Sequence, residues 1–154
     1  MIYNKLGKTN LKVSRLGFGG FQLAQFSLKT AHQLLAHAHY MGINFFDTSR
    51  DYRNSEELIG DALKKVRDTV VLSTKMTARE PFDLKRTLNL SLKKLKTHWV
   101  DIYCMHGVNS SSQLRHYEET VIPSLEKFRE EGSIKYIGLT THHTFIIEEA
   151  LANP

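Results

Sequence analysis

Short apolar runs alternate with longer amphipathic stretches along the chain, and this alternation restricts the fold more than any other feature. Runs rich in β-branched and aromatic residues predict strands at 15–20, 43–48, 69–75, 99–106 and 135–141. The stretches between them place apolar residues at helical spacing. Strands separated by helices form βαβ units whose strands pair in parallel. The sequence therefore predicts an α/β fold with about five parallel strands.

The intervening stretches each predict a helix with one apolar face. These faces comprise Leu34, Leu35, Ala38 and Met41; Leu58, Ile59, Ala62, Leu63 and Val66; and Leu84, Leu88, Leu92 and Leu95. Ser27 and Ser55 are expected N-caps, because a serine hydroxyl can bond a free N–H of the first turn. Pro81 is expected just before the third helix, and Gly132 at the end of the fourth.

Two further features decide between sheet types. IYNKL and LKV flank GKTN near the N-terminus, which predicts a β-hairpin outside the repeat. An open doubly wound sheet should carry G-x-G-x-x-G after its first strand, but Gln22 stands where the last glycine is needed. A barrel with only five strands stays open, so the apolar side chains on its inner face would be partly exposed. We expect such partial exposure at Val70, Leu72, Ile102 and Tyr103.

Composition narrows the function classes. The 154 residues suffice for one domain, expected to span 1–154. No apolar run approaches the ~20 residues of a membrane span, and the N-terminus lacks a secretory signal. A single cysteine, Cys104, fits a reducing cytoplasm. The net charge of +5 comes from lysines on predicted solvated helix faces, including Lys64, Lys65, Lys93, Lys94 and Lys96, so we expect neither nucleic acid nor membrane as a partner.

No metal site is expected. His37 and His39 point apart on a helix, and the adjacent His142 and His143 do not converge either.

Three predicted strands end in an ionisable residue: Asp47, Lys75 and His106. The carboxyl ends of parallel strands in a barrel open onto one face, so these side chains should converge there. Tyr52 lies five residues past Asp47 and can reach the same place. Each residue alone is more often a turn, surface or packing residue. The four together favour a barrel with a catalytic site.

The four residue types suit the protonation of a carbonyl. A phenol hydroxyl gives up its proton poorly at neutral pH, and a nearby ammonium stabilises the phenolate that remains. Tyr52 would thus be the general acid, and Lys75 would tune it. Asp47 would hold Lys75 in place, and His106 would orient the substrate oxygen.

The order of motifs resembles the aldo/keto reductase family over nearly all of the chain. The matching segments are YNKLGKTNLKVSRLGFGG, INFFDTSRDYRNSEELIGDAL, LSTKM, VDIYCMHG and KFREEGSIKYIGLT. The resemblance implies a (β/α)8 barrel of the TIM type and the reduction of aldehydes or ketones with a nicotinamide cofactor, usually NADPH, with NADH as the alternative. It implies that Asp47, Tyr52, Lys75 and His106 are catalytic. SEELIG and the TARE sequence at 77–80 look closer to the sugar- and aldose-dehydrogenase branch, and so to a sugar-like substrate.

The resemblance also assigns cofactor contacts. Gly20 and Phe21 match the backbone segment after the first strand, and Asp47 is also expected to contact the cofactor. Thr140 and Thr141 stand where many members have Ser-Asn to hold the carboxamide. Thr140 keeps a hydroxyl, whereas Thr141 lacks the amide's paired donor and acceptor.

The sequence supplies five of the family's eight βα units. We expect a fragment or truncated gene product, weak or inactive alone, or a chain that self-associates through unpaired strand edges. A non-catalytic binding or regulatory subunit with the same fold is the alternative.

Overall fold

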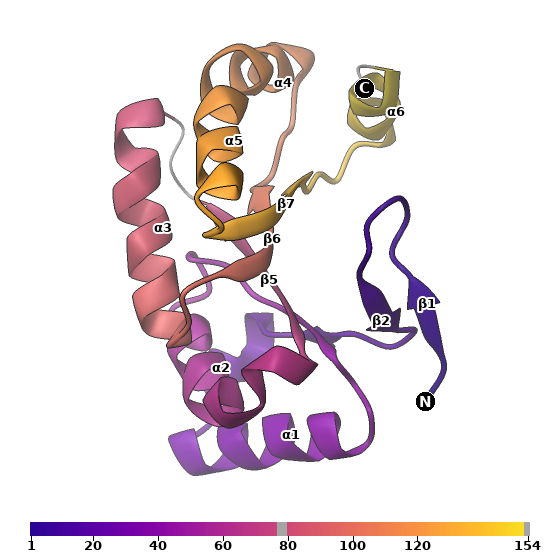
Figure 1. Ribbon diagram of the computed structural model, residues 1–154, viewed down its shortest axis with the longest axis vertical. Coiled ribbons are helices and arrows are strands. Elements are labelled where there is room, and N and C mark those ends of the chain that lie inside the picture. Colours follow the sequence, from indigo (N-terminus) through magenta and orange to yellow (C-terminus); the bar gives the residue numbers. More distant parts are fainter. Residues whose placement is uncertain (77–79, 153–154) are drawn as a thin grey trace.

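The computed structural model describes residues 1–76 and 80–152. The TARE sequence at 77–80, which suggested a branch of the family, lies largely outside the described residues. A β-hairpin opens the chain, followed by a parallel sheet and its helices (Figure 1). The strands are β1 (Tyr3–Lys5), β2 (Lys12–Ser14), β3 (Phe18–Gly19), β4 (Phe45–Asp47), β5 (Val71–Met76), β6 (Val100–Met105) and β7 (Ile134–Leu139). The α-helices are α1 (Leu28–Tyr40), α2 (Ser55–Leu63), α3 (Pro81–Leu95), α4 (Ser111–His116), α5 (Ile122–Glu130) and α6 (Thr144–Ala152).

The sheet order is sequential. β3, β4, β5, β6 and β7 lie side by side in chain order, and every neighbouring pair is parallel. A doubly wound sheet reverses direction at its switch point, whereas a barrel adds each strand beside the one before. The arrangement is therefore that of consecutive units of a β/α barrel, as expected. All five predicted strands form, with shorter bounds.

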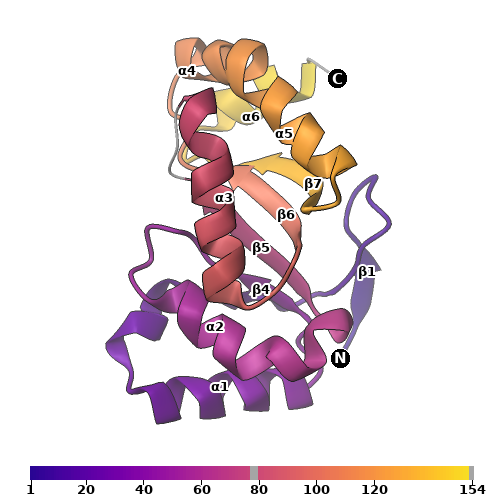
Figure 2. The ribbon, with the colours of Figure 1, turned by 60° about the vertical axis from the view of Figure 1, so that its left-hand side comes forward.

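Helices α1, α2, α3 and α5 cover one side of this sheet (Figures 1 and 2). The side chains of β5 point to the two faces of the sheet. Leu72 and Met76 join the hydrophobic core on the helix side, whereas Ser73 and Lys75 approach Asp47 of β4 on the other side. The core runs from α1 to α6 and includes Leu35, Phe46, Ile59, Leu72, Leu84, Leu88, Tyr103, Leu125 and Ile146. The strand ends that carry Asp47, Lys75 and His106 are thus backed by a continuous packed core; these three residues and Tyr52 are called the polar quartet below.

The hairpin lies at the end of the sheet where the strands begin. Asn44, directly before β4, accepts a hydrogen bond from the Ser14 N–H and donates one to the Lys12 carbonyl. Near the hairpin tip, the Asn10 N–H donates to the Tyr136 hydroxyl on β7. The predicted hairpin is confirmed, and it packs at the end of the sheet away from the polar quartet.

A buried ion pair joins the strands at this same end. Asp101 accepts hydrogen bonds from Arg67 at 2.8 Å, from Lys135 at 2.7 Å and from the Leu72 N–H at 3.0 Å. The Arg67 guanidinium also lies over the Trp99 ring, 4.5 Å from its centroid. In barrels this end serves stability rather than chemistry.

The predicted caps have mixed outcomes. Ser27 caps α1, since its hydroxyl accepts from the Thr30 N–H. Gly132 ends α5 with a φ of +77°, and Pro81 is the first residue of α3 rather than its predecessor. The N-cap prediction for Ser55 is wrong. Asn54 occupies that position, and the Ser55 hydroxyl instead donates to the Gly20 carbonyl, a tertiary contact that local preference does not predict.

Some burial predictions also fail. Leu34 is 40% exposed and Met41 is 56% exposed, because Ala31, Leu35 and Ala38 form the buried face of α1. Val70, Leu72 and Tyr103 do not lack cover. They are buried, because the helices pack over that side of the sheet, whereas Ile102, which pairs with Ser73 of β5, is half-buried as expected.

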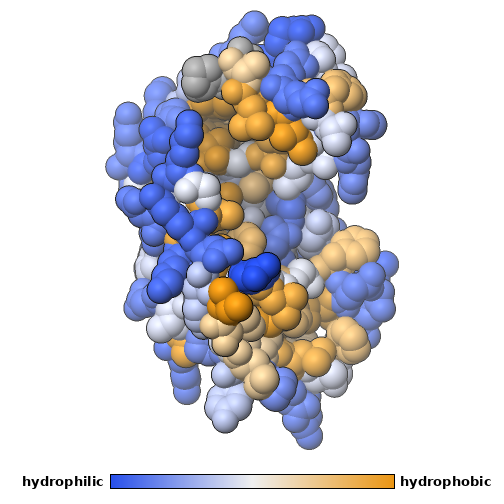
Figure 3. Space-filling model, turned by 90° about the vertical axis from the view of Figure 1, so that its right-hand side faces the viewer, coloured by the Kyte–Doolittle hydropathy of each residue, from blue (hydrophilic) through white to orange (hydrophobic). Residues whose placement is uncertain are grey.

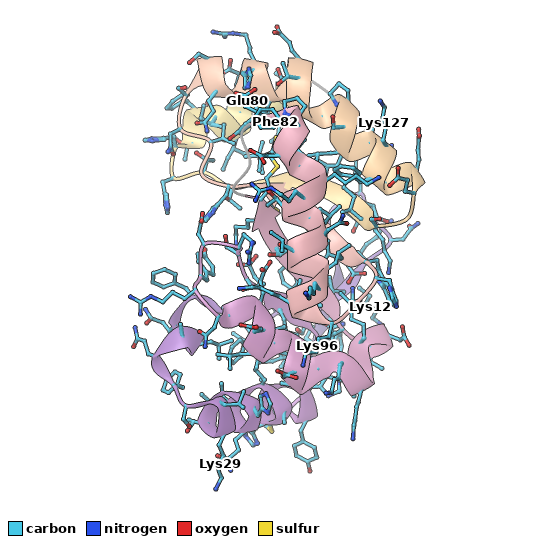
Figure 4. All side chains as sticks on the ribbon, turned by 90° about the vertical axis from the view of Figure 1, so that its left-hand side faces the viewer. Lys12, Lys29, Glu80, Phe82, Lys96 and Lys127 are labelled. Carbon is cyan, nitrogen blue, oxygen red and sulfur yellow. The ribbon has the colours of Figure 1, made fainter. Side chains whose placement is uncertain are left out.

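The lysines at the end of α3 confirm the reading of the helix surfaces. Lys93 and Lys96 are exposed, and Lys94 is half-buried. Lys96 has a left-handed conformation with φ of +53° and pairs with Asp61 of α2. Figure 4 shows Lys96 at the end of α3 nearest to α2.

An open groove adjoins the last strand. It has a volume of about 890 Å³ and lies between β7, α5 and α6, with Ile137, Leu139, Ile122 and Ile147 among its lining residues. Apolar side chains gather in the upper and lower parts of the face that carries α6 and the hairpin (Figure 3). No helix within residues 1–76 and 80–152 is long and apolar enough to cross a membrane.

Candidate active site

The four predicted residues meet at the carboxyl ends of neighbouring strands. Asp47 ends β4, Lys75 lies near the end of β5, and His106 follows β6 directly. The loop after β4 crosses this end of the sheet, where the Thr48 N–H donates to the Ser73 carbonyl, and it brings Tyr52 over the strands. The barrel topology therefore assembles side chains that are up to 59 positions apart in sequence.

Lys75 is the buried centre of this group. Its ammonium donates to Asp47 Oδ2 at 2.5 Å and to the Thr48 carbonyl at 2.7 Å. The second Asp47 oxygen accepts from the Ser73 hydroxyl at 2.9 Å. The lysine side chain is 6% exposed, so a paired carboxylate is needed to keep its charge inside the protein.

Tyr52 stands between Lys75 and His106. The Lys75 ammonium lies 4.9 Å from the centre of the Tyr52 ring, and the His106 ring lies 5.8 Å away, nearly perpendicular to it. The exposed Phe21 ring also packs edge-on against the Tyr52 ring, with 5.0 Å between the two ring centres. Within the described residues no group hydrogen-bonds the Tyr52 hydroxyl. The hydroxyl is thus available to a bound molecule.

The loop that carries Tyr52 is held by a buried carboxylate. Glu56 is 1% exposed, accepts from the Thr74 hydroxyl at 2.8 Å and pairs with Arg50 at 3.4 Å. The Tyr52 N–H closes a turn onto the Ser49 carbonyl at 3.0 Å. These contacts fix the loop on both sides of the tyrosine.

His106 has two partners that the sequence reasoning missed. Its Nδ1 lies 3.1 Å from the Ser49 hydroxyl and 3.2 Å from an oxygen of Asp51. Asp51 directly precedes Tyr52, so an acidic residue inside the loop between β4 and α2 was the available signal.

Gly20 occupies a position without room for a side chain. Its N–H donates to the Asp47 carbonyl at 2.7 Å, and its carbonyl accepts from the Ser55 hydroxyl at 2.8 Å. A Cβ on Gly20 would lie 2.5 Å from that hydroxyl and 2.9 Å from the Asp47 carbonyl oxygen. The main chain of Gly20 therefore fixes the end of β4.

The two threonines after β7 differ in their contacts. The Thr140 hydroxyl accepts from the Gly107 N–H at 3.1 Å, beside His106. The Thr141 hydroxyl accepts from the His143 N–H at 3.0 Å, a local turn before α6. Thr140 thus lies next to the quartet, while Thr141 is committed to its own loop.

The only cysteine lies beneath the quartet. Cys104 on β6 is buried, and burial raises the pKa of its thiol to about 11, although the nearby Ser73 hydroxyl and Lys75 charge oppose this. A thiol of this kind is inert rather than nucleophilic at neutral pH.

Among residues 1–76 and 80–152, no group of three or more histidine, cysteine, aspartate or glutamate side chains could hold a metal ion.

The sequence matches a known family. The family model of the aldo/keto reductases matches residues 15–154. The chain is 35% identical to an L-galactose dehydrogenase of Arabidopsis thaliana, over 88% of its own length and 47% of that protein. It is 31% identical to the oxidoreductase YqkF of Bacillus subtilis, over 94% of its length and 50% of that protein.

Solved structures agree. An aldo-keto reductase of Bacillus halodurans in its holo form superposes with a TM-score of 0.87 at 27% identity, covering 99% of this chain and 54% of that one. The thermostable aldo-keto reductase Tm1743, in complex with the inhibitor epalrestat, gives a TM-score of 0.85 at 31% identity, covering 99% and 58%. The chain spans about half the length of these relatives and has the fold of the corresponding part of a (β/α)8 barrel. It belongs to the aldo/keto reductase family.

Proposed function

We propose that this chain carries the proton-donating part of a carbonyl reductase that acts on small aldehydes or ketones, sugar-like ones included. The observation that carries the proposal is the position of Lys75, which is ion-paired to Asp47 and lies over the Tyr52 ring. A cation fixed against an aromatic ring stabilises the phenolate left after proton donation. His106 adjoins the same ring.

In this mechanism the Tyr52 hydroxyl donates its proton to the carbonyl oxygen while a hydride is added to the carbonyl carbon, so the product is an alcohol. A nicotinamide cofactor, NADPH or alternatively NADH, supplies that hydride when it is bound. The Lys75 ammonium balances the charge that remains on Tyr52. His106 orients the substrate oxygen, and Phe21 supplies an apolar wall beside Tyr52.

The described residues fit the nicotinamide end of such a cofactor. The Thr140 hydroxyl, anchored beside His106, would hold the carboxamide. Asp47 and the backbone at Gly20 and Phe21 would form the floor of the site. Because both polar groups of the Gly20 backbone are already bonded, we assign this glycine to the shape of the site rather than to a direct bond. Thr141 would contribute less, since its hydroxyl is occupied in a turn.

We further propose that residues 1–154 form one partial barrel domain and that turnover by this chain alone is weak. The contacts proposed above concern the nicotinamide of the cofactor, and none of them concerns the phosphates of a dinucleotide. Much of the binding energy that would orient the cofactor is therefore missing, and orientation accounts for a large part of enzymatic rates. The single buried thiol suits a reducing cytoplasm.

The test is oxidation of NADPH with a panel of aldehydes, comparing wild type with Tyr52→Phe. Wild type should show slow turnover, and the variant should lose at least ~100-fold of it, the usual scale of a general acid. Equal rates in the two proteins would refute the assignment of Tyr52. Tyr40→Phe is the matched control, because Tyr40 is 84% exposed on α1.

A non-catalytic binding subunit is the second candidate, and the groove beside β7 is the observation that favours it. This alternative predicts that wild type and Tyr52→Phe both lack turnover, and that both retain whatever binding the wild type shows.

A further inference from the structure

We propose that Asp51 is a positioning residue that fixes the His106 ring with its proton on Nδ1. Nδ1 lies 3.2 Å from an Asp51 carboxylate oxygen and 3.1 Å from the Ser49 hydroxyl, at the carboxyl end of β6.

The two partners of Nδ1 have different hydrogen-bonding capacities. A hydroxyl can donate to Nδ1 or accept from it, so Ser49 alone would allow either tautomer. An ionised carboxylate can only accept. If Nδ1 carried its lone pair, that lone pair would face the negative Asp51 oxygen, which is unfavourable. A proton on Nδ1 satisfies Asp51 and remains compatible with Ser49 as a second acceptor.

Ser49 is itself fixed in a way that supports this assignment. Its side chain is buried, and its hydroxyl accepts from the Asp51 N–H at 3.2 Å. The loop therefore holds Asp51 and Ser49 together against one edge of the His106 ring. The carboxylate, which is 58% exposed, is the partner whose chemistry decides between the tautomers.

The assignment changes what His106 offers to a substrate. With the proton on Nδ1, the neutral ring carries a lone pair at Nε2, and no residue among 1–76 and 80–152 is bonded to that atom. A ring in this form can accept a hydrogen bond at Nε2, and it can donate one to a carbonyl oxygen only when Nε2 also carries a proton. The bearing on reduction rests on the proposed function, whereas the ring tautomer does not.

The experiment is long-range ¹H–¹⁵N correlation NMR of this chain, with the His106 signals assigned from His106→Asn. In its neutral form the wild-type ring should show Nδ1 as the protonated nitrogen. Asp51→Ala should move Nδ1 to the resonance range of a nitrogen with a lone pair in most molecules, because Ser49 can then donate to it. Ser49→Ala should leave the wild-type pattern unchanged.

Asp68→Ala is the matched control, since Asp68 is an exposed aspartate at the opposite ends of the strands. It should leave the His106 signals unchanged. A wild-type ring protonated at Nε2 would overturn the proposal, and so would an Asp51→Ala ring that keeps its proton on Nδ1. Both readouts are independent of turnover, so a failure of the proposed reductase activity would be seen separately.

Discussion

At the scale of single residues, the site depends on how tightly its backbone is packed. Asp47 reaches Lys75 because its own carbonyl is fixed by the Gly20 N–H at 2.7 Å. Small backbone displacements at this point would move the carboxylate and hence the ammonium next to Tyr52. Gly20, which allows this close approach, therefore matters to the geometry of the site as much as Asp47 and Lys75 do.

Gly20→Ala tests this packing. The new Cβ would meet the Ser55 hydroxyl at 2.5 Å and the Asp47 carbonyl at 2.9 Å, so we expect a loss of ~1–3 kcal/mol in the free energy of unfolding. Gly19→Ala is the control, because a Cβ there has no atom within 4 Å, and its stability should not fall. Urea denaturation of both variants makes the comparison, and equal stabilities would contradict the account.

Cys104 gives a prediction about pH. Burial raises the pKa of its thiol from about 9 to about 11, so the unfolded chain loses this proton first as the pH rises. Stability from this group is complete below about pH 9 and declines between about pH 9 and pH 11, by at most ~1.4 kcal/mol per pH unit. Denaturation at pH 8 and pH 10 should show a larger loss for wild type than for Cys104→Ala. Equal losses would contradict the assignment.

The sequence predicts the positions of some of these site residues and not of others. Lys75 and His106 were predictable because each follows an apolar run, and topology brings strand ends together. Ser55 was not, since its hydroxyl bonds Gly20 across 35 positions instead of capping its own helix. Asp51 was missed for the same reason, because a loop carboxylate finds His106 only once the sheet has formed.

At the level of secondary-structure elements, the ion pairs of Asp101 at the amino ends of the strands connect neighbouring βα units. Arg67 lies in the segment before β5, and Asp101 and Lys135 lie on β6 and β7. Besides Asp101, the Arg67 guanidinium donates to the Val70 and Trp99 carbonyls. The buried Asp101 carboxylate thus links β6 to β7 through Lys135 and to the segment before β5 through Arg67.

Arg67→Met tests this role. It leaves Asp101 buried with less compensation, which should lower the free energy of unfolding by ~3–5 kcal/mol. Arg86→Met is the control, because Arg86 is 71% exposed in a surface pair with Asp83, and it should cost ~1 kcal/mol or less. Thermal denaturation compares the stabilities of the two variants. An equal loss of stability in both would contradict this role of Arg67.

The elements themselves were largely predictable. Every expected strand formed, because β-branched runs between helical patterns have few other arrangements. The buried face of α1 was not predicted correctly: leucines at Leu34 and Leu35 are equally apolar, and only packing against α2 determines which one is buried.

At the scale of the whole molecule, the sheet has two edges, β3 and β7. The β7 edge adjoins an apolar groove of about 890 Å³. Unpaired edges and open apolar surfaces favour association with another chain. We therefore predict that this chain associates with a second copy of itself.

Size-exclusion chromatography combined with NADPH titration tests it. We expect this chain to elute as an assembly larger than a monomer, with weak affinity for NADPH. A well-folded monomer that binds NADPH at micromolar concentration would contradict the expectation.

The proposed reductase site requires Lys75 to act through Tyr52, and a double-mutant cycle in single-turnover reduction of one aldehyde tests this coupling most directly. The proteins are wild type, Tyr52→Phe, Lys75→Met and the double variant, with Lys85→Met as the control. If Lys75 acts through Tyr52, the double variant should be no slower than the slower single variant. Losses that multiply, or a wild type without detectable reduction, would contradict the claim.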